Sequence, residues 1–310
     1  MTDNPRPETI CFIGLGTMGR EMAINVMKAG HRVQAFDVRR EAVEDLAMLG
    51  APACRSVAAA ARDAAIAITM LPDTPDVESV VYGDGGLLAH PPKGRLVIDM
   101  STIAPNAARR MSAEFESAGV DFLDAPVSGG PGGARNATLS IMVGGRIEAF
   151  ARAEKLFAVM GTTITHVGAS GAGQTVKLCN QLICGINIQA ICEAIALGRA
   201  SGVDLHQLRN VLLGGSAASW MLDNLGPAMI EGDAKAGFRI DLMLKDLRLV
   251  QEQAQSLAVP LPATALVTSQ YIEARAYDEG GNGNQALFRV YDRMTNQVRT
   301  ATAKSGDAPA

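Results

Sequence analysis

The sequence is poor in aromatic residues and has no long apolar run. Aromatic side chains make up 4% of its 310 residues, and there is one tryptophan. No uninterrupted apolar stretch of about 18 residues occurs, so we expect no membrane span. The opening residues, MTDNPRPETI, include charged side chains and two prolines but no apolar segment, so we expect no secretory signal.

Cysteine and histidine are also scarce. There are five cysteines, an odd number without a CxxC pair, and the four histidines form no local cluster. We therefore expect no metal site, and histidine is not the expected acid or base if the protein is an enzyme. Unpaired thiols used as small core residues suit a reducing compartment, so we expect a cytoplasmic protein.

The charge balance argues against one class of partner. The chain has 28 basic and 32 acidic residues, a formal net charge of -4, which provides no basic footprint for nucleic acid. Hydrophobic residues make up 48% and charged residues 19%, which is ordinary for a soluble globular protein. The length is sufficient for two domains.

A dinucleotide-binding pattern begins close to the start of the chain. Residues 9–14, TICFIG, are typical of a buried strand, and GLGTMG at 14–19 has the G-x-G-x-x-G spacing. A helix is predicted up to Gly30, and a second strand ends at Asp37. Strand, glycine turn, helix, strand and acidic residue form the context in which this pattern binds a dinucleotide.

The glycines of this turn have separate expected roles. Gly14 permits the tight turn, Gly16 lets the backbone approach the pyrophosphate, and Gly19 allows close packing of helix on strand. The helix N-terminus adds free N–H groups for the phosphates. The residues of the turn predicted to bind the cofactor are Gly14, Leu15, Gly16, Thr17, Met18 and Gly19.

The acidic residue at the end of the second strand bears on the choice of cofactor. Asp37 lies where a carboxylate bonds the ribose hydroxyls, and it would repel the extra phosphate of NADP, so we expect NAD. Arg39 and Arg40 follow closely and leave NADP possible. The alternative interpretation of both arginines is solvated charge at the start of the next helix.

Strands and helices continue to alternate along the first half of the chain. The alternation predicts a Rossmann-type, doubly wound parallel sheet over residues 1–168. Ligands of such sheets bind beyond the carboxyl ends of the strands. Leu71 and Pro72 follow one predicted strand, and Ser101 and Thr102 follow the next, so these positions are expected at the ligand site.

A glycine-rich segment follows the strand that ends near Ala125. Ser128, Gly129 and Gly130 come directly after it. Adjacent glycines let backbone N–H groups turn toward an anion, and a serine hydroxyl adds a donor. We interpret the segment as the site of a substrate carboxylate, with a flexible loop as the alternative.

The alternation ends at Gly171. Three later segments predict helices: LHQLRNVLL, DLMLKDLRLVQEQAQSLA and ALVTSQYIEARAY. Residues 169–300 are therefore predicted to form an all-α domain for substrate binding and oligomerisation, joined to the first domain by a long helix that starts at Gly171. Residues 301–310 lack large apolar side chains and are predicted to be disordered.

The long predicted helix carries polar residues among apolar ones. The run 171–198 is apolar on every side, which is typical of a buried helix. Lys177, Asn180 and Gln181 have the i, i+3, i+4 spacing of one helix face. Because burial lowers the pKa of a lysine toward neutrality, Lys177 is a candidate general acid or base. The alternative is a solvated lysine near a helix end.

Four motifs, taken in order, resemble those of the beta-hydroxyacid dehydrogenase family. They are GLGTMG at 14–19, DAPVSGG at 124–130, GAGQTVKLCNQ at 171–181 and KDL at 245–247. The resemblance extends from about Ile10 to the last helix. It implies an NAD(P)-dependent oxidoreductase that transfers hydride reversibly between the nicotinamide and a short beta-hydroxyacid or semialdehyde.

The resemblance also implies roles for single residues. Lys177 is the expected catalytic residue, and Ser128, Gly129 and Gly130 are expected to hold the substrate. Thr102 and Lys245 are expected to contact the cofactor or the substrate, with Phe238 near the same pocket. Many family members have asparagine four residues after the lysine, where this chain has Gln181 preceded by Asn180, so both amides are candidate substrate ligands.

Within the family, the semialdehyde reductase branch has the more similar motifs. The expected reaction is therefore reduction of tartronate semialdehyde to glycerate with NADH. The alternatives are oxidation of hydroxyisobutyrate, reduction of glyoxylate or succinic semialdehyde, and a nucleotide-sensing protein that kept the fold without the chemistry. We also expect a homodimer or homotetramer, because the second domain is too thin to bury all its apolar helix faces alone.

Overall fold

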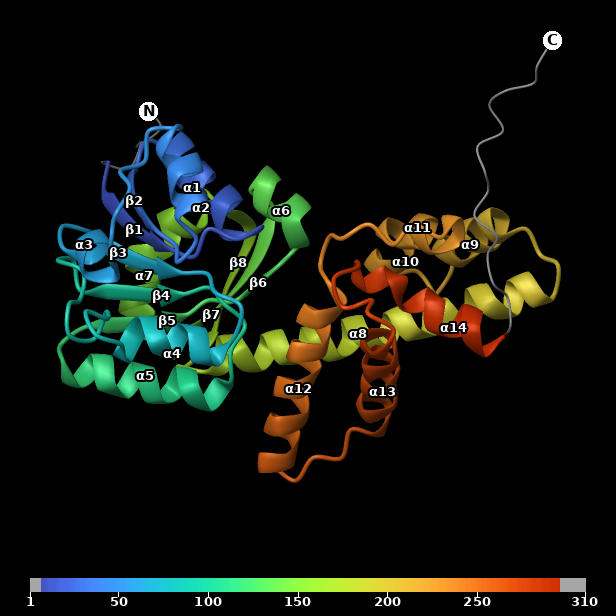
Figure 1. Cartoon of the computed structure of the whole chain (residues 1–310). Helices are drawn as coiled ribbons and strands as arrows, with labels where there is room; N and C mark the ends of the chain where they lie inside the picture. Colours follow the sequence, from blue (N-terminus) through green and yellow to red (C-terminus); the bar gives the residue numbers. More distant parts are fainter. Residues whose placement is uncertain (1–6, 296–310) are drawn as a thin grey trace, which may run out of the picture. The chain divides into compact units, whose positions relative to one another are not determined.

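The computed structural model describes residues 7–295, which form two compact units (Figure 1). Unit 1 runs to Gln181 and includes Glu252–Val259; unit 2 comprises Leu182–Gln251 and the chain from Pro260 onward. The division falls inside α8 (Ala172–Ala200), which is continuous from one unit to the other. The predicted disordered segment, residues 301–310, lies outside the described residues.

Unit 1 is built on one sheet, with the strand order β2-β1-β3-β4-β5-β7-β6 and with β8 paired to β7. The strands are β1 (Thr9–Ile13), β2 (Arg32–Phe36), β3 (Ile66–Thr69), β4 (Leu96–Asp99), β5 (Asp121–Asp124), β6 (Val127–Ser128), β7 (Leu139–Gly145) and β8 (Gly161–Gly168). The pairs from β2 to β5 are all parallel. Their carboxyl ends therefore lie along one edge of the sheet.

Helices cover both faces of this sheet because successive strand residues point to opposite sides. On β1, Ile10 and Phe12 pack into one apolar cluster with α1, α2, α6 and α7, whereas Cys11 and Ile13 pack into another with α3, α4 and α5. The helices are α1 (Gly19–Lys28), α2 (Arg40–Ala47), α3 (Val57–Ala61), α4 (Thr74–Tyr82), α5 (Pro105–Ser117), α6 (Gly130–Asn136) and α7 (Ile147–Phe157). The Rossmann-type, doubly wound fold predicted for this part of the chain is confirmed.

Two details of unit 1 differ from the predictions. The sheet is not parallel throughout, because β7 runs antiparallel to β5 and β6. The glycine-rich segment after Ala125 is not a simple loop either: Ser128 ends β6, and α6 begins at Gly130. Pro131 fits in the first turn of α6, where a missing N–H leaves no bond unmade.

Unit 2 is helical, as predicted. Its apolar cluster joins Ile188, Ile191 and Ile195 of α8 to residues of the later helices, including Leu247 and Tyr271. Those helices are α9 (Leu205–Leu213), α10 (Trp220–Asn224), α11 (Gly226–Glu231), α12 (Ile240–Ser256), α13 (Pro262–Ala276), η1 (Asn284–Leu287) and α14 (Phe288–Met294). The short elements α10, α11, η1 and α14 were not predicted, because none is long enough to show a helical period.

Helix α8 is long and apolar enough to cross a membrane, by length and composition only. Buried core helices of soluble proteins meet the same criterion, so one such helix is weak evidence for a span. The helix also carries buried Gln174, Lys177 and Gln181. Polar side chains of this kind are rare within membrane spans, and its later turns belong to the core of unit 2.

Candidate active site

The glycine turn has the geometry that close phosphate binding requires. Gly14 has a φ of +93°, and a Cβ added there would collide with the carbonyl oxygen of Met70. A Cβ at Gly19 would collide with the carbonyl oxygen of Gly14. At Gly16, in contrast, an added Cβ meets nothing within 4 Å, so the backbone there is open to a ligand. Gly14 and Gly19 thus shape the turn, and Gly16 exposes it.

Asp37 is bonded to the turn and to a neighbouring arginine. Its Oδ2 accepts the N–H of Leu15 at 2.7 Å, and Arg39 donates through Nε to Oδ1 at 3.1 Å and through NH2 to Oδ2 at 3.0 Å. Burial alone would raise the pKa of this carboxyl, but the bonds from Arg39 and Leu15 outweigh it and lower the pKa. Asp37 is therefore held as an anion directly beside the glycine turn.

A cavity of about 330 Å³ opens beside this turn. Its lining combines backbone of the turn with charged side chains from α1, α2 and α6: Leu15, Gly16, Thr17, Arg20, Glu21, Arg39, Glu41, Ala42, Asp45 and Arg135. Open glycine backbone for a pyrophosphate and an adjacent fixed carboxylate for a ribose are the groups that a nicotinamide dinucleotide needs. The residues present thus fit NAD or NADP.

The carboxyl ends of β3 and β4 are joined by buried polar groups. Thr69 donates its hydroxyl to Asp99 Oδ1 at 2.7 Å, and the same oxygen accepts the N–H of Ser101 at 3.2 Å. The Ser101 hydroxyl in turn accepts the N–H of Leu71 at 2.9 Å. These bonds fix the backbone of the segments that contain Leu71, Pro72 and Thr102, the predicted cofactor contacts at this edge.

A second buried carboxylate lies on the adjacent strand β5, where Asp124 pairs in register with Asp99. Asp124 accepts two N–H groups at the start of α8, from Gly171 at 2.7 Å and from Gln174 at 2.9 Å. Burial raises its pKa to about 6, against the lowering effect of these two bonds. The start of α8 is thereby attached to the carboxyl edge of the sheet.

Lys177 lies one turn further along α8 and is 6% exposed. Its Nζ donates to Gln181 Oε1 at 2.9 Å, and the Asn180 side-chain amide donates to the same oxygen at 2.8 Å. The three residues predicted to share a helix face thus form one hydrogen-bonded group. Gln181 is buried, whereas Asn180 is only partly buried. The solvated-lysine alternative for Lys177 is wrong.

The predicted carboxylate site lies where β6 passes into α6. Gly129 and Gly130 both have positive φ angles, +132° and +61°, which L side chains adopt rarely. Ser128 pairs with Ser140 of β7 and is partly exposed. Gly129 is exposed and Gly130 is partly exposed, so the backbone of this turn is accessible to an anion.

Two predicted site residues belong to unit 2. Lys245, on α12, forms an ion pair with its neighbour Asp246, with 2.7 Å between Nζ and Oδ1. Phe238 precedes α12, is partly buried and packs against the apolar cluster of unit 2. Their contacts with cofactor and substrate stay predictions.

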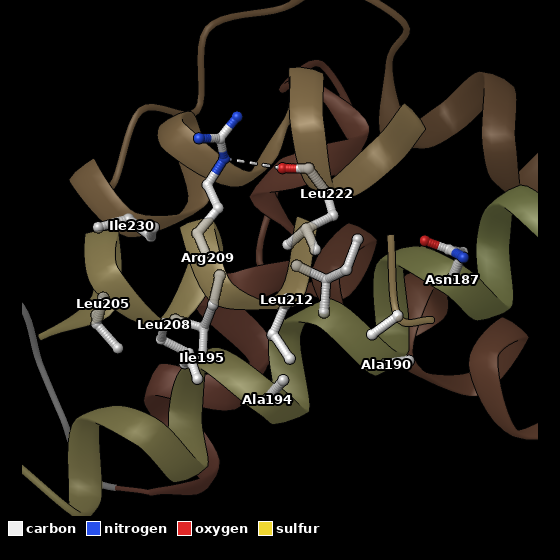
Figure 2. Close-up of a pocket in the computed structure, with 12 residues that line it drawn as sticks. Asn187, Ala190, Ala194, Ile195, Leu205, Leu208, Arg209, Leu212, Leu222 and Ile230 are labelled. Atoms are coloured by element: carbon white, nitrogen blue, oxygen red, sulfur yellow. Dashed lines mark hydrogen bonds between the residues drawn. The ribbon is translucent and has the colours of Figure 1, made fainter. Parts of the chain in front are cut away.

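A further pocket, of about 230 Å³, lies within unit 2 and is shown in Figure 2. Its lining is mostly aliphatic and comes from α8 to α11, with Leu205, Leu208 and Leu212 of α9 prominent. Arg209 lies at its border and donates to the carbonyl oxygen of Leu222 at 3.1 Å. None of the predicted site residues lines this pocket.

Comparison with known families assigns both parts of the chain. Residues 9–168 match the family model described as the NAD binding domain of 6-phosphogluconate dehydrogenase. Residues 171–291 match the one described as NAD-binding of NADP-dependent 3-hydroxyisobutyrate dehydrogenase. The chain belongs to the beta-hydroxyacid dehydrogenase family.

Individual relatives of this dehydrogenase extend over nearly its whole length. It is 40% identical to 2-hydroxy-3-oxopropionate reductase of Escherichia coli, over 92% of this chain and 97% of the relative. It is 43% identical to the NAD-dependent L-serine dehydrogenase of Pseudomonas aeruginosa, over 84% and 90%. A solved structure of Mycobacterium tuberculosis 3-hydroxyisobutyrate dehydrogenase with L-serine has a TM-score of 0.85, with 34% identity over 92% of this chain and 99% of that one.

The predictions of family, fold and enzyme class are therefore confirmed. The dehydrogenase is an NAD(P)-dependent oxidoreductase of the beta-hydroxyacid family, and these relatives act on small carboxylates.

Several polar residues of this site were not predicted. Asp99, Asp124 and Gln174 are each 0% exposed, and together they connect β4, β5 and α8. Asp124 is the first residue of the DAPVSGG motif, and Gln174 lies within GAGQTVKLCNQ. The position of Asp124 and Gln174 inside these motifs was the only sign of a role in the sequence. Their hydrogen bonds could not be predicted, because they join segments far apart in the sequence.

Proposed function

We propose that the dehydrogenase interconverts a short 3-hydroxycarboxylate and its semialdehyde, with Lys177 as the general acid and base. The observation that carries the proposal is the buried Lys177 amine, which is hydrogen-bonded to Gln181 and lies one helical turn beyond the bonds that attach α8 to the sheet. The bound nicotinamide supplies or accepts the hydride. In reduction, protonated Lys177 gives its proton to the developing alkoxide oxygen; in oxidation, neutral Lys177 takes the hydroxyl proton.

The other predicted residues have supporting roles in this proposal. Ser128, Gly129 and Gly130 hold the substrate carboxylate. The glycine turn and Asp37 hold the cofactor, with Leu71, Pro72, Thr102 and Lys245 as further contacts and Phe238 beside the substrate. Gln181 is engaged by both Lys177 and Asn180, so we assign it to orienting the lysine, and Asn180, the more exposed amide, to the substrate. Because all five cysteines are free thiols, we also infer the cytoplasm as the compartment.

We propose tartronate semialdehyde, reduced to glycerate, as the substrate. Glycerate, L-serine and 3-hydroxyisobutyrate differ only in the group on the second carbon, which is a hydroxyl, an ammonium or a methyl. An amide beside that carbon favours a hydroxyl, with which it can form a hydrogen bond, over a methyl, with which it cannot. Asn180 therefore disfavours the methyl compound, and the Escherichia coli relative is a reductase of the hydroxyl-bearing semialdehyde.

The test of the catalytic assignment is Lys177→Ala. Loss of a general acid-base group lowers kcat by roughly a hundred- to ten-thousandfold, while the fold and cofactor affinity should persist. Lys93→Ala, which removes an exposed lysine, is the control and should behave as wild type. Near-normal turnover of the Lys177 variant would overturn the assignment, and no turnover of the wild type on any short hydroxyacid would favour the nucleotide-sensing alternative.

The test of the substrate is the ratio of kcat/KM for glycerate, L-serine and 3-hydroxyisobutyrate under one set of conditions. We expect glycerate to be preferred, and Asn180→Val to shift the ratio toward the methyl compound. Cys179→Ala, at the exposed neighbouring position, should leave the ratio unchanged. A wild-type preference for 3-hydroxyisobutyrate or L-serine would contradict the tartronate proposal and identify the alternative directly.

We also infer a homodimer or homotetramer. Unit 2 leaves large apolar side chains exposed, among them Ile183, Leu197, Val211 and Trp220. Exposed apolar surface of this extent marks contact surfaces in many proteins. Light scattering after size-exclusion chromatography should give a multiple of 32.4 kDa, and a monomer mass would contradict the inference.

A further inference from the structure

We propose that Asp124 and Gln174 are positioning residues for Lys177, and that Asp124 performs this role only as a carboxylate. The proposal rests on the assignment of Lys177 as the general acid and base. Neither residue is expected to touch the substrate or the cofactor. Instead, they fix the first turn of α8 on the edge of the sheet, so that the lysine one turn later has a defined place.

The contact between Asp124 and α8 replaces bonds that a helix cannot make for itself. The first N–H groups of an α-helix have no acceptor within the helix. Here Gly171 and Gln174 donate theirs to the two oxygens of one carboxylate, at 2.7 Å to Oδ1 and 2.9 Å to Oδ2. Asp124 and Gln174 are both 0% exposed, so bulk water does not reach either partner. One buried side chain therefore sets both the position and the direction of this turn.

Two glycines make the contact possible. A Cβ added to Gly144 of β7 would lie 2.6 Å from Asp124 Oδ1, and one added to Gly173 would lie 2.9 Å from Asp124 Oδ2. Any larger residue at either position would displace the carboxylate or the helix. The absence of side chains on both sides shows a site built for close approach, rather than a chance pairing of an acid with a helix end.

Gln174 adds a second attachment at a different strand. Its Oε1 accepts the N–H of Ile103 at 3.0 Å, and its Nε2 donates to the carbonyl oxygen of Ser101 at 2.8 Å. Both bonds are to the segment that follows β4, next to β5 in the sheet. With one contact to β5 and another beyond β4, α8 can neither slide nor rotate on the edge, and Lys177 is three residues from Gln174 on the same side of the helix.

The charged groups around Asp124 come from several elements. Burial is the largest effect and raises the pKa of Asp124 to about 6; Asp99, beside it on β4, contributes a smaller rise. Arg109 of α5 packs against Gly171, since a Cβ there would lie 2.9 Å from its Nε. His166 of β8 bonds the carbonyl oxygen of Gly145, and Lys177 follows on α8. The neighbour from β7 is the uncharged Gly144, and Arg152 of α7 pairs with Asp121 at the opposite end of β5.

Protonation of Asp124 would change one acceptor oxygen into a donor that faces a backbone N–H. The bond from Gly171 or from Gln174 would then be lost, and the first turn of α8 would no longer be held at two points. Turnover should therefore fall as the pH decreases through about 6. In the direction of reduction Lys177 must be protonated, so the lysine itself cannot cause a loss of activity toward low pH.

The experiment is the pH dependence of kcat for reduction by the full-length enzyme and by Asp124→Asn. The wild type should lose kcat below about pH 6. Asp124→Asn should lack this pH-dependent step in kcat. Its kcat should be lowered roughly ten- to a hundredfold, the scale expected for a displaced catalytic group. Its KM for the cofactor should be unchanged. Asp121→Asn, on the same strand, is the control and should keep both the step and the kcat. A step that persists in Asp124→Asn, or a wild-type kcat in that variant, would overturn the proposal.

A second variant keeps the proposal testable if Asp124→Asn does not fold. Gln174→Met keeps the side-chain volume and the backbone N–H donated to Asp124, but removes both bonds to Ser101 and Ile103. It should lower kcat while keeping the step near pH 6. Unchanged kcat in Gln174→Met would contradict the positioning role. If Lys177→Ala is inactive and these variants behave as wild type, only this inference is wrong; if Lys177→Ala is active, the proposed function itself is wrong.

Unfolding provides a readout independent of turnover. A carboxyl whose pKa is higher in the folded than in the unfolded protein stabilises the fold fully below the unfolded pKa, and this contribution is lost as the pH rises through the folded pKa. For Asp124 those limits are 3.8 and about 6. The free energy of unfolding of the wild type, measured with urea relative to Asp124→Asn, should therefore decrease as the pH rises from 3.8 to about 6. A constant difference would show that Asp124 does not titrate there and would overturn its ionisation as the switch.

Discussion

The two glycine-rich turns of the candidate site have different physical requirements for glycine. In the turn at 14–19, Gly14 and Gly19 lie against backbone oxygens, so any side chain there would collide with the main chain. In the turn that follows β6, Gly130 has open space around the position of a Cβ, and only its φ of +61° favours glycine. Packing thus constrains Gly14 and Gly19 of the first turn, whereas backbone conformation alone constrains Gly130 of the second.

This difference shows that glycine content by itself does not indicate how strongly a turn is constrained. A turn fixed by packing belongs to the core and cannot change without a change in the sheet. A glycine that is required only by its backbone conformation, as Gly130 is, tolerates a side chain at a modest energetic cost. Substitution of individual glycines by alanine can therefore separate stability from binding.

The largest effect is expected for Gly14→Ala. The new Cβ would meet the Met70 carbonyl oxygen and lie 2.9 Å from Leu71 Cδ2, in a backbone with a φ of +93°. Left-handed strain of roughly 1–2 kcal/mol and overpacking of about 1–3 kcal/mol add up to a severe loss of stability. Urea unfolding measures it. Stability equal to wild type would show that the packing at this turn relaxes easily and would remove the contrast between the turns.

Gly16→Ala should affect the cofactor alone. An added Cβ meets no atom of the protein within 4 Å, so the free energy of unfolding should change by less than about 0.5 kcal/mol. The same methyl group would occupy the space that a pyrophosphate needs, and the KM for NADH should rise tenfold or more, equivalent to about 1.4 kcal/mol. An unchanged KM would place the pyrophosphate elsewhere.

Asp37→Ala should weaken NADH binding and relax the discrimination against NADPH. The substitution removes a charged hydrogen-bond acceptor for the ribose, worth about 1.5–3 kcal/mol. It also releases Arg39, which is paired with Asp37 in the wild type, so that Arg39 can bind the extra phosphate of NADPH. The ratio of kcat/KM for the two cofactors measures the change. Arg40→Ala is the control, since Arg40 pairs with Glu44 instead. A wild type that already prefers NADPH would show that Asp37 does not set the preference.

Gly130→Ala should have the smallest effect on stability among the glycine variants that strain the backbone. It introduces left-handed strain of about 1 kcal/mol without a collision. If its N–H contacts the substrate carboxylate, the KM for glycerate should rise severalfold while the KM for NADH stays constant. A rise in the KM for NADH instead would assign this turn to the cofactor.

The sequence predicted the glycine turn well because two of its contacts, Gly19 against Gly14 and Leu15 with Asp37, lie within one βαβ unit, although the contact of Gly14 with Met70 does not. Gly14, Gly19 and Asp37 lie within one strand-helix-strand segment, and its pattern is specific. Helix α6 was missed because Gly and Pro dominate it, although Pro131 suits its first turn. The antiparallel direction of β7 was also missed, since the pairing of a strand depends on distant segments rather than on its own residues.

The buried bonds of the candidate site illustrate the same limit. Lys177, Asn180 and Gln181 were predicted as one group because helical spacing brings them together. Asp124 was passed over although it lies in a recognised motif, because its partners Gly171 and Gln174 are 47 and 50 residues away. A carboxylate at a strand end and a glycine at a helix start give no sign in the sequence that they meet.

The attachment of α8 to Asp124 has a consequence for the protection of its amides. The first amides of a helix usually exchange with deuterium quickly, because they lack acceptors and helix ends fray. In α8 the N–H groups of Gly171 and Gln174 are buried and bonded to a carboxylate in the sheet. Their exchange should therefore require opening of the sheet itself, and the beginning of this helix should be among the most slowly exchanging parts of unit 1.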